Sequence, residues 1–230
     1  MTTQRDTVYA LSSSPGRSAL SIIRITGENA FFVLEKITKI KKKKIKHQTS
    51  FPCSIFNINN ELIDTAVTTF YCSPNSYTGE DLVEITTHGN PIIIDRLFNT
   101  LKNVGLRLAN PGEFTSRAYH NKKIDLIQAE STLSVINAKS KAGVQSSLKG
   151  VIGKLSNKLE EVRKLLVLSL AELEYELDIS ETNNNKNVIN RAERTIKKTI
   201  LDMENLIKTH NKSSIITDGA RVVIVGAPNV

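Results

Sequence analysis

The chain has 230 residues, a hydrophobic content of 40% and a formal net charge of +8, which is enough for one large domain or two small domains. It contains no apolar run of about 18 residues and no continuous apolar stretch near its start, so we expect neither a membrane-spanning helix nor a signal peptide. This composition agrees with a cytoplasmic protein, and the positive charge permits an anionic partner.

Strands and two helices alternate over about the first 110 residues. Strands are predicted at 7–11, 20–25, 51–58, 63–71, 82–87 and 106–109, and helices at 27–36 and 92–103. Because several strands are joined by short turns, the pattern favours an α+β domain with a mixed sheet over a purely parallel sheet.

The segment 75–91, NSYTGEDLVEITTHGNP, predicts a loop, a strand, a tight turn and a helix that begins at Pro91. Glu84 lies in the middle of the apolar strand, where a carboxylate is costly unless it is paired or hydrogen-bonded. Glu84 therefore either faces water or binds a partner. Arg24, in the second strand, likewise lies either on an exposed face or in a pocket. His88 lies at the turn beside a helix N-terminus that can hold an anion, and the alternative is a histidine on a solvated turn.

The lysine-rich segment KIKKKKIK, at Lys39–Lys46, holds six lysines and no acidic residue. Such a run is usually a solvated loop, and phosphate contact is the alternative. Arginines interleaved with aromatic residues, which would favour nucleic-acid binding more strongly, are absent from it.

Cys53 and Cys72 lie in strand-like segments without CxxC spacing, and the four histidines show no metal-ligand spacing. We therefore expect free, buried thiols in a reducing cytoplasm, with a disulfide as the alternative. No metal site is predicted from these residues.

After Pro111–Phe114 the sequence changes to an almost entirely helical pattern. Helices are predicted at 113–120, from 125 through about 150, along a third, longer segment, and at 188–210 after a polar loop at 180–187. The apolar residues of the third helix recur at spacings of three and four and form one stripe: Leu148, Ile152, Leu155, Leu159, Val162, Leu166, Leu170, Leu173 and Leu177. The stripe predicts bundle packing, and Gly150 and Gly153 mark a break from the helix before it.

The final residues predict a buried strand at 222–225 that leads into Gly226. A phosphate-binding loop has the pattern G-x-x-x-x-G-K-[ST] after such a strand, and residues 226–230 match its first five positions. The lysine and helix that complete a phosphate cradle do not follow. We therefore expect the 230 residues alone to be unable to hydrolyse a nucleotide, and residues 221–230 to be loosely held. A C-terminal edge strand is the alternative.

Four groups of residues occur in a characteristic order and spacing. They are Ser14-Pro15-Gly16-Arg17 followed by Arg24; Asn75 to Asp81 followed by Glu84 and His88-Gly89; Pro111-Gly112-Glu113-Phe114 followed by Arg117-Ala118, Asn121 to Leu126 and Gln128-Ala129-Glu130; and the terminal Gly226-Ala227-Pro228-Asn229. Together they resemble the MnmE family of tRNA modification GTPases, also called TrmE. The resemblance covers essentially the whole chain. The sequence differs from the family pattern at Asn90 and Ser18, where the family commonly has glycine.

The resemblance implies a folate-binding-like α+β domain at 1–120, an incomplete helical domain at 121–212, and the first strand and partial phosphate-binding loop of a G domain at 213–230. In the family the first domain binds 5-formyl- or methylene-tetrahydrofolate and forms a homodimer. With an FAD-containing partner, the family modifies C5 of the wobble uridine of tRNA, and its G domain hydrolyses GTP with potassium and magnesium. The family's C-terminal helices are absent, so we expect the apolar stripe to be exposed.

By the same resemblance, Arg24, Glu84 and Lys123 contact folate, and Asn229, near Gly226, contacts nucleotide and potassium. Glu84 suits the N–H donors of a pterin ring, while Arg24 and Lys123 suit the folate's carboxylates or its ring carbonyl. The structural alternative is a salt bridge between Glu84 and one of the two cations. Two alternative functions stay open, namely a folate-binding module without catalysis and a basic RNA-binding adaptor based on the lysine run.

Overall fold

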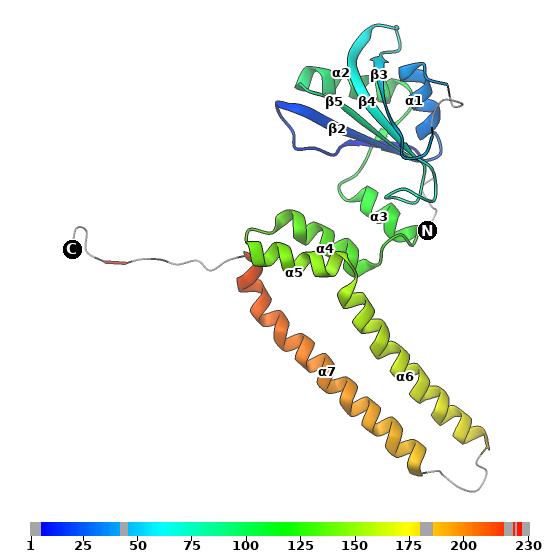
Figure 1. Cartoon of the computed structure of the whole chain (residues 1–230), viewed down its shortest axis with the longest axis vertical. Helices are drawn as coiled ribbons and strands as arrows, with labels where there is room; N and C mark the ends of the chain where they lie inside the picture. The colour runs from blue at the N-terminus through cyan, green and yellow to red at the C-terminus, as the bar shows by residue number, and fades with distance from the viewer. Residues whose placement is uncertain (1–5, 42–45, 180–185, 219–222, 224, 227–230) are drawn as a thin grey trace. The chain divides into compact units, whose positions relative to one another are not determined.

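The computed structural model describes residues 6–41, 46–179, 186–218, 223, 225 and 226. The chain divides into two compact units, 1–124 and 125–230 (Figure 1). No helix in the described ranges is long and apolar enough to cross a membrane. The sequence-based domain ranges of 1–120, 121–212 and 213–230 stay predictions.

The N-terminal unit is built on one six-stranded sheet in the order β3-β4-β5-β2-β1-β6. The strands are β1 (Val8–Leu11), β2 (Ser18–Thr26), β3 (Ser50–Phe56), β4 (Leu62–Tyr71), β5 (Leu82–Gly89) and β6 (Arg107–Leu108). Neighbouring strands are antiparallel except β1 and β6, which are parallel. The predicted α+β unit with a mixed sheet is therefore confirmed.

Two helices, α1 (Ala30–Thr38) and α2 (Pro91–Asn103), pack against one face of the sheet and form the hydrophobic core with it. The short α3 (Glu113–His120) follows β6. Pro91 is the first residue of α2, as predicted, and the Asn90 side chain caps the helix by accepting a hydrogen bond from the Ile92 N–H. This turn therefore fixes where β5 ends.

The strand register places charged residues on the sheet face opposite the core. Arg24 of β2 lies across from Glu84 of β5, and Glu84 lies across from Thr69 of β4. Successive side chains of a strand point to opposite faces, so these residues avoid the face on which Ile23 and Ile85 are fully buried. The charges that interrupt the apolar strands therefore gather on one surface.

The second unit contains the helices α4 (Leu126–Asn137), α5 (Lys141–Val151), α6 (Lys154–Ile179) and α7 (Lys186–Asp218). The prediction of one helix from 125 through about 150 was wrong. Ala138 is extended, and the Ser140 side chain caps a new helix by accepting a hydrogen bond from the Gly143 N–H. The last helix also continues to Asp218 and does not end near 210.

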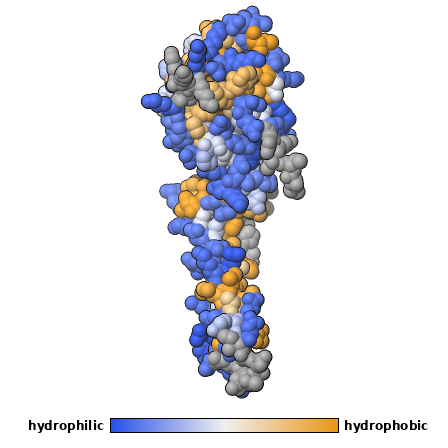
Figure 2. Space-filling model, turned by 90° about the vertical axis from the view of Figure 1, so that its right-hand side faces the viewer, coloured by the Kyte–Doolittle hydropathy of each residue, from blue (hydrophilic) through white to orange (hydrophobic). Residues whose placement is uncertain are grey.

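The predicted stripe does not lie on one helix, because Leu148 belongs to α5, Ile152 is the C-cap of α5, and α6 begins only at Lys154. The part of the stripe on α6 is mostly exposed, as expected. Val162 is 8% exposed, whereas Leu166, Leu170 and Leu177 are 39%, 55% and 71% exposed. Apolar patches accordingly interrupt the polar surface of the helices in Figure 2. The described helices therefore bury only part of the stripe that the sequence pattern marks.

The strand expected at 222–225 is not formed at the positions that the structure describes. Val223 and Val225 lie outside any strand and are 79% and 90% exposed, while residues 222 and 224 lie outside the described residues. A strand needs a paired neighbour, and none of the six described strands pairs with Val223 or Val225.

Candidate functional site

Arg24 and Glu84 form an ion pair on the sheet face opposite the core. Arg24 Nε donates to Glu84 Oε1 at 2.7 Å, and the two side chains are 35% and 22% exposed. The Tyr71 hydroxyl donates to the second carboxylate oxygen of Glu84 at 3.4 Å. Burial raises the pKa of Tyr71, and the negative charge of Glu84 raises it further. The structural alternative, a salt bridge between Glu84 and a predicted folate cation, is therefore present, with Arg24 as the cation.

The ion pair leaves most of the Arg24 donors available. Arg24 donates to Glu84 through Nε alone. Within the described ranges, its two terminal guanidinium nitrogens form no hydrogen bond. The Tyr77 ring lies beside the guanidinium, with its centroid 5.8 Å from the guanidinium carbon, and the Tyr77 hydroxyl lies 3.0 Å from Thr115 Oγ1 of α3. Arg24 can therefore bind an anionic or carbonyl group without losing its pair with Glu84.

Lys123 lies just after α3, is exposed, and donates its backbone N–H to the Ala118 carbonyl at 2.8 Å. Its ammonium forms no ion pair with a described residue. Its side chain packs against Gly79, where φ is +77° and a Cβ would lie 3.1 Å from Lys123 Cγ. The loop at 73–81 thus contacts Lys123 through Gly79 and Arg24 through Tyr77, and it links the three predicted folate residues.

The predicted nucleotide and potassium contacts stay predictions. Asn229 lies outside the described residues, and Gly226 is exposed with no atom within 4 Å of the position of a Cβ. No group of three or more metal-binding His, Cys, Asp or Glu occurs among the described residues. Cys53 and Cys72 are free, and they are partly rather than fully buried.

The Asn90 side chain caps the N-terminus of α2, and the side-chain contact of His88 is with Asp64. The His88 Nδ1 atom lies 2.8 Å from Asp64 Oδ1, and the His88 backbone N–H donates to Asp64 Oδ2 at 2.9 Å. The ring is 62% exposed. Asp64 therefore orients an exposed histidine, which agrees with the alternative of a solvated turn.

The lysine run is exposed where the structure describes it, at Lys39, Lys41 and Lys46, which agrees with a solvated loop. Residues 42–45 lie outside the described residues. The Lys39 ammonium lies 4.2 Å from the centroid of the Phe56 ring, so this end of the run is held by a cation–π contact.

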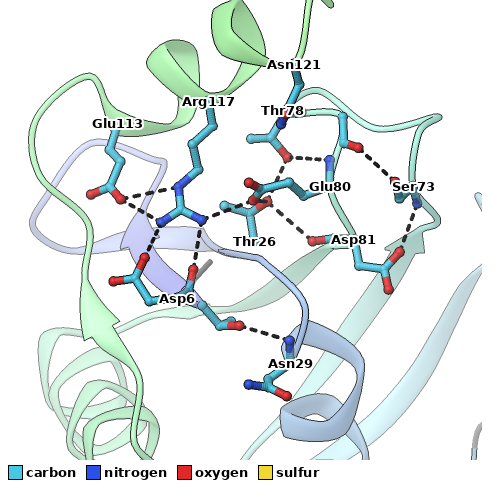
Figure 3. A network of polar contacts seen from close by, with 12 residues as sticks. Asp6, Thr26, Asn29, Ser73, Thr78, Glu80, Asp81, Glu113, Arg117 and Asn121 are labelled. Carbon is cyan, nitrogen blue, oxygen red and sulfur yellow. Dashed lines mark hydrogen bonds and ion pairs between the residues drawn. The ribbon is translucent and has the colours of Figure 1, made fainter. Parts of the chain in front are cut away.

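Sequence reasoning missed a cluster of charges centred on Arg117 of α3 (Figure 3). The Arg117 side chain is 8% exposed, and its guanidinium donates to Asp6 Oδ1 at 2.9 Å, to Glu80 Oε2 at 3.1 Å and to Glu113 Oε1 at 2.7 Å. Arg107 also binds Asp6 and Glu113, both at 2.8 Å. The sequence showed only the i,i+4 spacing of Glu113 and Arg117, because Asp6 and Glu80 lie 111 and 37 residues away.

The two arginines stabilise the charged form of the carboxylates in this cluster. The hydrogen bond from Arg107, followed by that from Arg117, lowers the pKa of Glu113 to about 2 even though burial opposes the shift. Arg107 also lowers the pKa of Asp6. Because these pKa values are lowered, both carboxylates are ionised at neutral pH and remain paired with the arginines.

A chain of hydroxyl groups extends the cluster into loop 73–81 (Figure 3). Thr26 Oγ1 donates to Glu80 Oε2 at 3.1 Å and lies 2.7 Å from Thr78 Oγ1. The Asn121 side chain donates to the Thr78 carbonyl at 2.7 Å. Because Thr26 belongs to β2 and Asn121 follows α3, the loop is tied on both sides.

Comparison with known proteins finds relatives along the whole chain. The model of the family "GTP-binding protein TrmE N-terminus" matches residues 7–123, and that of the "MnmE helical domain" matches residues 126–221. The tRNA modification GTPase MnmE of Francisella philomiragia is 38% identical over 228 residues, which are 98% of this chain and 49% of the relative. The proteins of the same name from Fervidobacterium nodosum and Endomicrobium trichonymphae are 38% and 36% identical, over 98% of this chain and 50% and 49% of each relative. The chain thus spans about half the length of the curated relatives it matches.

Proposed function

The chain belongs to the MnmE (TrmE) family of tRNA modification GTPases, and on this premise we propose that its N-terminal unit binds a tetrahydrofolate derivative through Arg24, Glu84 and Lys123. One observation carries the proposal. The Arg24–Glu84 pair leaves the terminal guanidinium nitrogens of Arg24 without a described partner, and the exposed Lys123 packs on the same loop that contacts Arg24.

These groups fit the chemistry of a folate. The pterin ring presents adjacent N–H donors, which the Glu84 carboxylate accepts, and a charge-assisted hydrogen bond of this kind is worth roughly 1.5–3 kcal/mol. Arg24 and Lys123 bind the folate's glutamate carboxylates or its ring carbonyl. When bound, the folate supplies a one-carbon unit, in the form of 5-formyl- or methylene-tetrahydrofolate.

For the whole protein we propose GTP-dependent modification of tRNA in the cytoplasm. The protein forms a homodimer through its N-terminal domain and acts with an FAD-containing partner to install a carboxymethylaminomethyl-type group at C5 of the wobble uridine. Its G domain binds GTP, potassium and magnesium, with Asn229 as a nucleotide and potassium contact. The 230 residues include neither the lysine nor the serine or threonine that complete a phosphate-binding loop after Gly226. We therefore propose that these residues do not hydrolyse GTP by themselves.

Calorimetric titration of the 230-residue chain with 5-formyltetrahydrofolate tests the folate proposal. We expect Glu84→Ala to weaken binding about tenfold or more, because about 1.4 kcal/mol corresponds to a factor of ten and the lost contact is charge-assisted. Glu28→Ala removes an exposed carboxylate outside the site and should bind like the wild type. Absence of binding by the folded wild type, or equal binding by Glu84→Ala, would contradict the proposal.

A further inference from the structure

Loop 73–81 contacts both ends of the proposed folate site, through the Tyr77 ring beside Arg24 and through Gly79 beside Lys123. We propose that Arg117 is a positioning residue for this site, which holds the loop through Glu80 and thereby sets the spacing of the folate-binding side chains. The inference rests on the proposed folate function, but the placement of the loop can be measured without folate.

The loop is attached to α3 and to the residue after it at three successive points. The contacts are Arg117 Nη1 to Glu80 Oε2 at 3.1 Å, Thr115 Oγ1 to the Tyr77 hydroxyl at 3.0 Å, and Asn121 Nδ2 to the Thr78 carbonyl at 2.7 Å. The helix therefore fixes the part of the loop that lies next to Arg24 and Lys123.

The contact between Arg117 and Glu80 differs from the other two because it is ionic and its arginine is buried. The Arg117 side chain is 8% exposed and that of Glu80 is 25% exposed, so the arginine charge would remain poorly hydrated if the pair separated. Glu80 Oε2 also accepts a hydrogen bond from Thr26, which lies two positions after Arg24 on β2. The same carboxylate oxygen thus ties α3, the loop and the strand of Arg24 together.

Arg107 provides a matched control within the same cluster. It binds Asp6 and Glu113, as Arg117 does, but it forms no hydrogen bond or ion pair with a described residue of loop 73–81. Arg107→Met removes two ion pairs without detaching the loop, while Arg117→Met removes three. A difference between the two variants therefore reports the contacts that Arg117 makes with Glu80 and with the Asp6 backbone carbonyl, and Glu80→Gln tests the first of these separately.

The experiment combines amide hydrogen exchange with calorimetric titration of 5-formyltetrahydrofolate, both on the 230-residue chain. Arg117→Met should speed exchange of the amides of residues 73–81 and weaken folate binding about tenfold, the lower end of the 10- to 100-fold loss seen when partners that orient metal ligands are removed. Arg107→Met should leave both near the wild-type values. Arg117→Lys keeps a charge that can reach Glu80 and should restore part of the affinity.

Several outcomes would overturn the inference. Equal increases in loop exchange for Arg117→Met and Arg107→Met would show a general loss of stability and no positioning role. Unchanged exchange at 73–81 in Arg117→Met would show that Arg117 does not hold the loop. If Arg117→Met fails to fold, Glu80→Gln, which leaves the arginines paired with Asp6 and Glu113, must reproduce the faster loop exchange. If the wild type binds no folate, the proposed function fails, while the exchange data still decide whether Arg117 holds the loop.

Discussion

Replacing Glu113 by Gln tests how much the charge cluster stabilises the N-terminal unit. The hydrogen bond from Arg107, aided by Arg117 and the Asn110 N–H, lowers the pKa of Glu113 from 4.5 to about 2. At roughly 1.4 kcal/mol per pKa unit, this shift corresponds to about 3 kcal/mol of unfolding free energy at neutral pH. Because the folded pKa lies below the unfolded pKa, this stability is complete above about pH 4.5 and is lost as the pH falls toward about 2.

Tyrosine fluorescence follows the unfolding of this unit, because Tyr9, Tyr71, Tyr77 and Tyr119 lie in it and Tyr175 lies in the helical unit. Glutamine mimics the protonated carboxyl group. Urea titrations should therefore show the variant to be less stable than the wild type by about 3 kcal/mol at pH 7 and by about 0.4 kcal/mol at pH 2. A difference that stays constant between these pH values would refute the electrostatic reasoning.

Two further pairs of variants test close packing, one pair in each unit. Gly79→Ala and Gly112→Ala both place alanine at a φ of +77°, which costs about 1–2 kcal/mol, but only Gly79 has close neighbours around the new Cβ. Thermal denaturation should show a larger loss for Gly79→Ala, with weaker folate binding through Lys123, and equal losses would argue against the close approach. In the helical unit, Val162→Ala should cost about 1.5 kcal/mol, while Leu177→Gln, at a residue that is 71% exposed, should change stability by less than about 0.5 kcal/mol. Urea unfolding followed by far-ultraviolet circular dichroism measures both, and the reverse order would contradict the burial pattern.

Patterns of local origin were predictable from the sequence. Apolar alternation located the strands, and the preference of proline for the first position of a helix located the start of α2 at Pro91. Both signals depend on residues that are close together in the chain. The break at 138–140 was missed, since Ser140 resembled other polar helix positions and its role as a cap depends on the backbone around it. The stripe on α6 was recognised, but the pattern alone did not show how little of it neighbouring helices bury.

By itself, the sequence determined the family and the α+β and helical character of the two parts, because motif spacing and residue type are properties of the linear chain. Its resemblance to that family supplied Arg24, Glu84 and Lys123 as candidate folate residues. Only the tertiary structure decided that Arg24 pairs with Glu84, since strand register brings together residues that are 60 positions apart. It also decided that Arg117 joins Asp6, Glu80 and Glu113 in one cluster. A buried charge selects its partners by distance in space, and the packing of α3 against the loop and the N-terminal segment sets that distance.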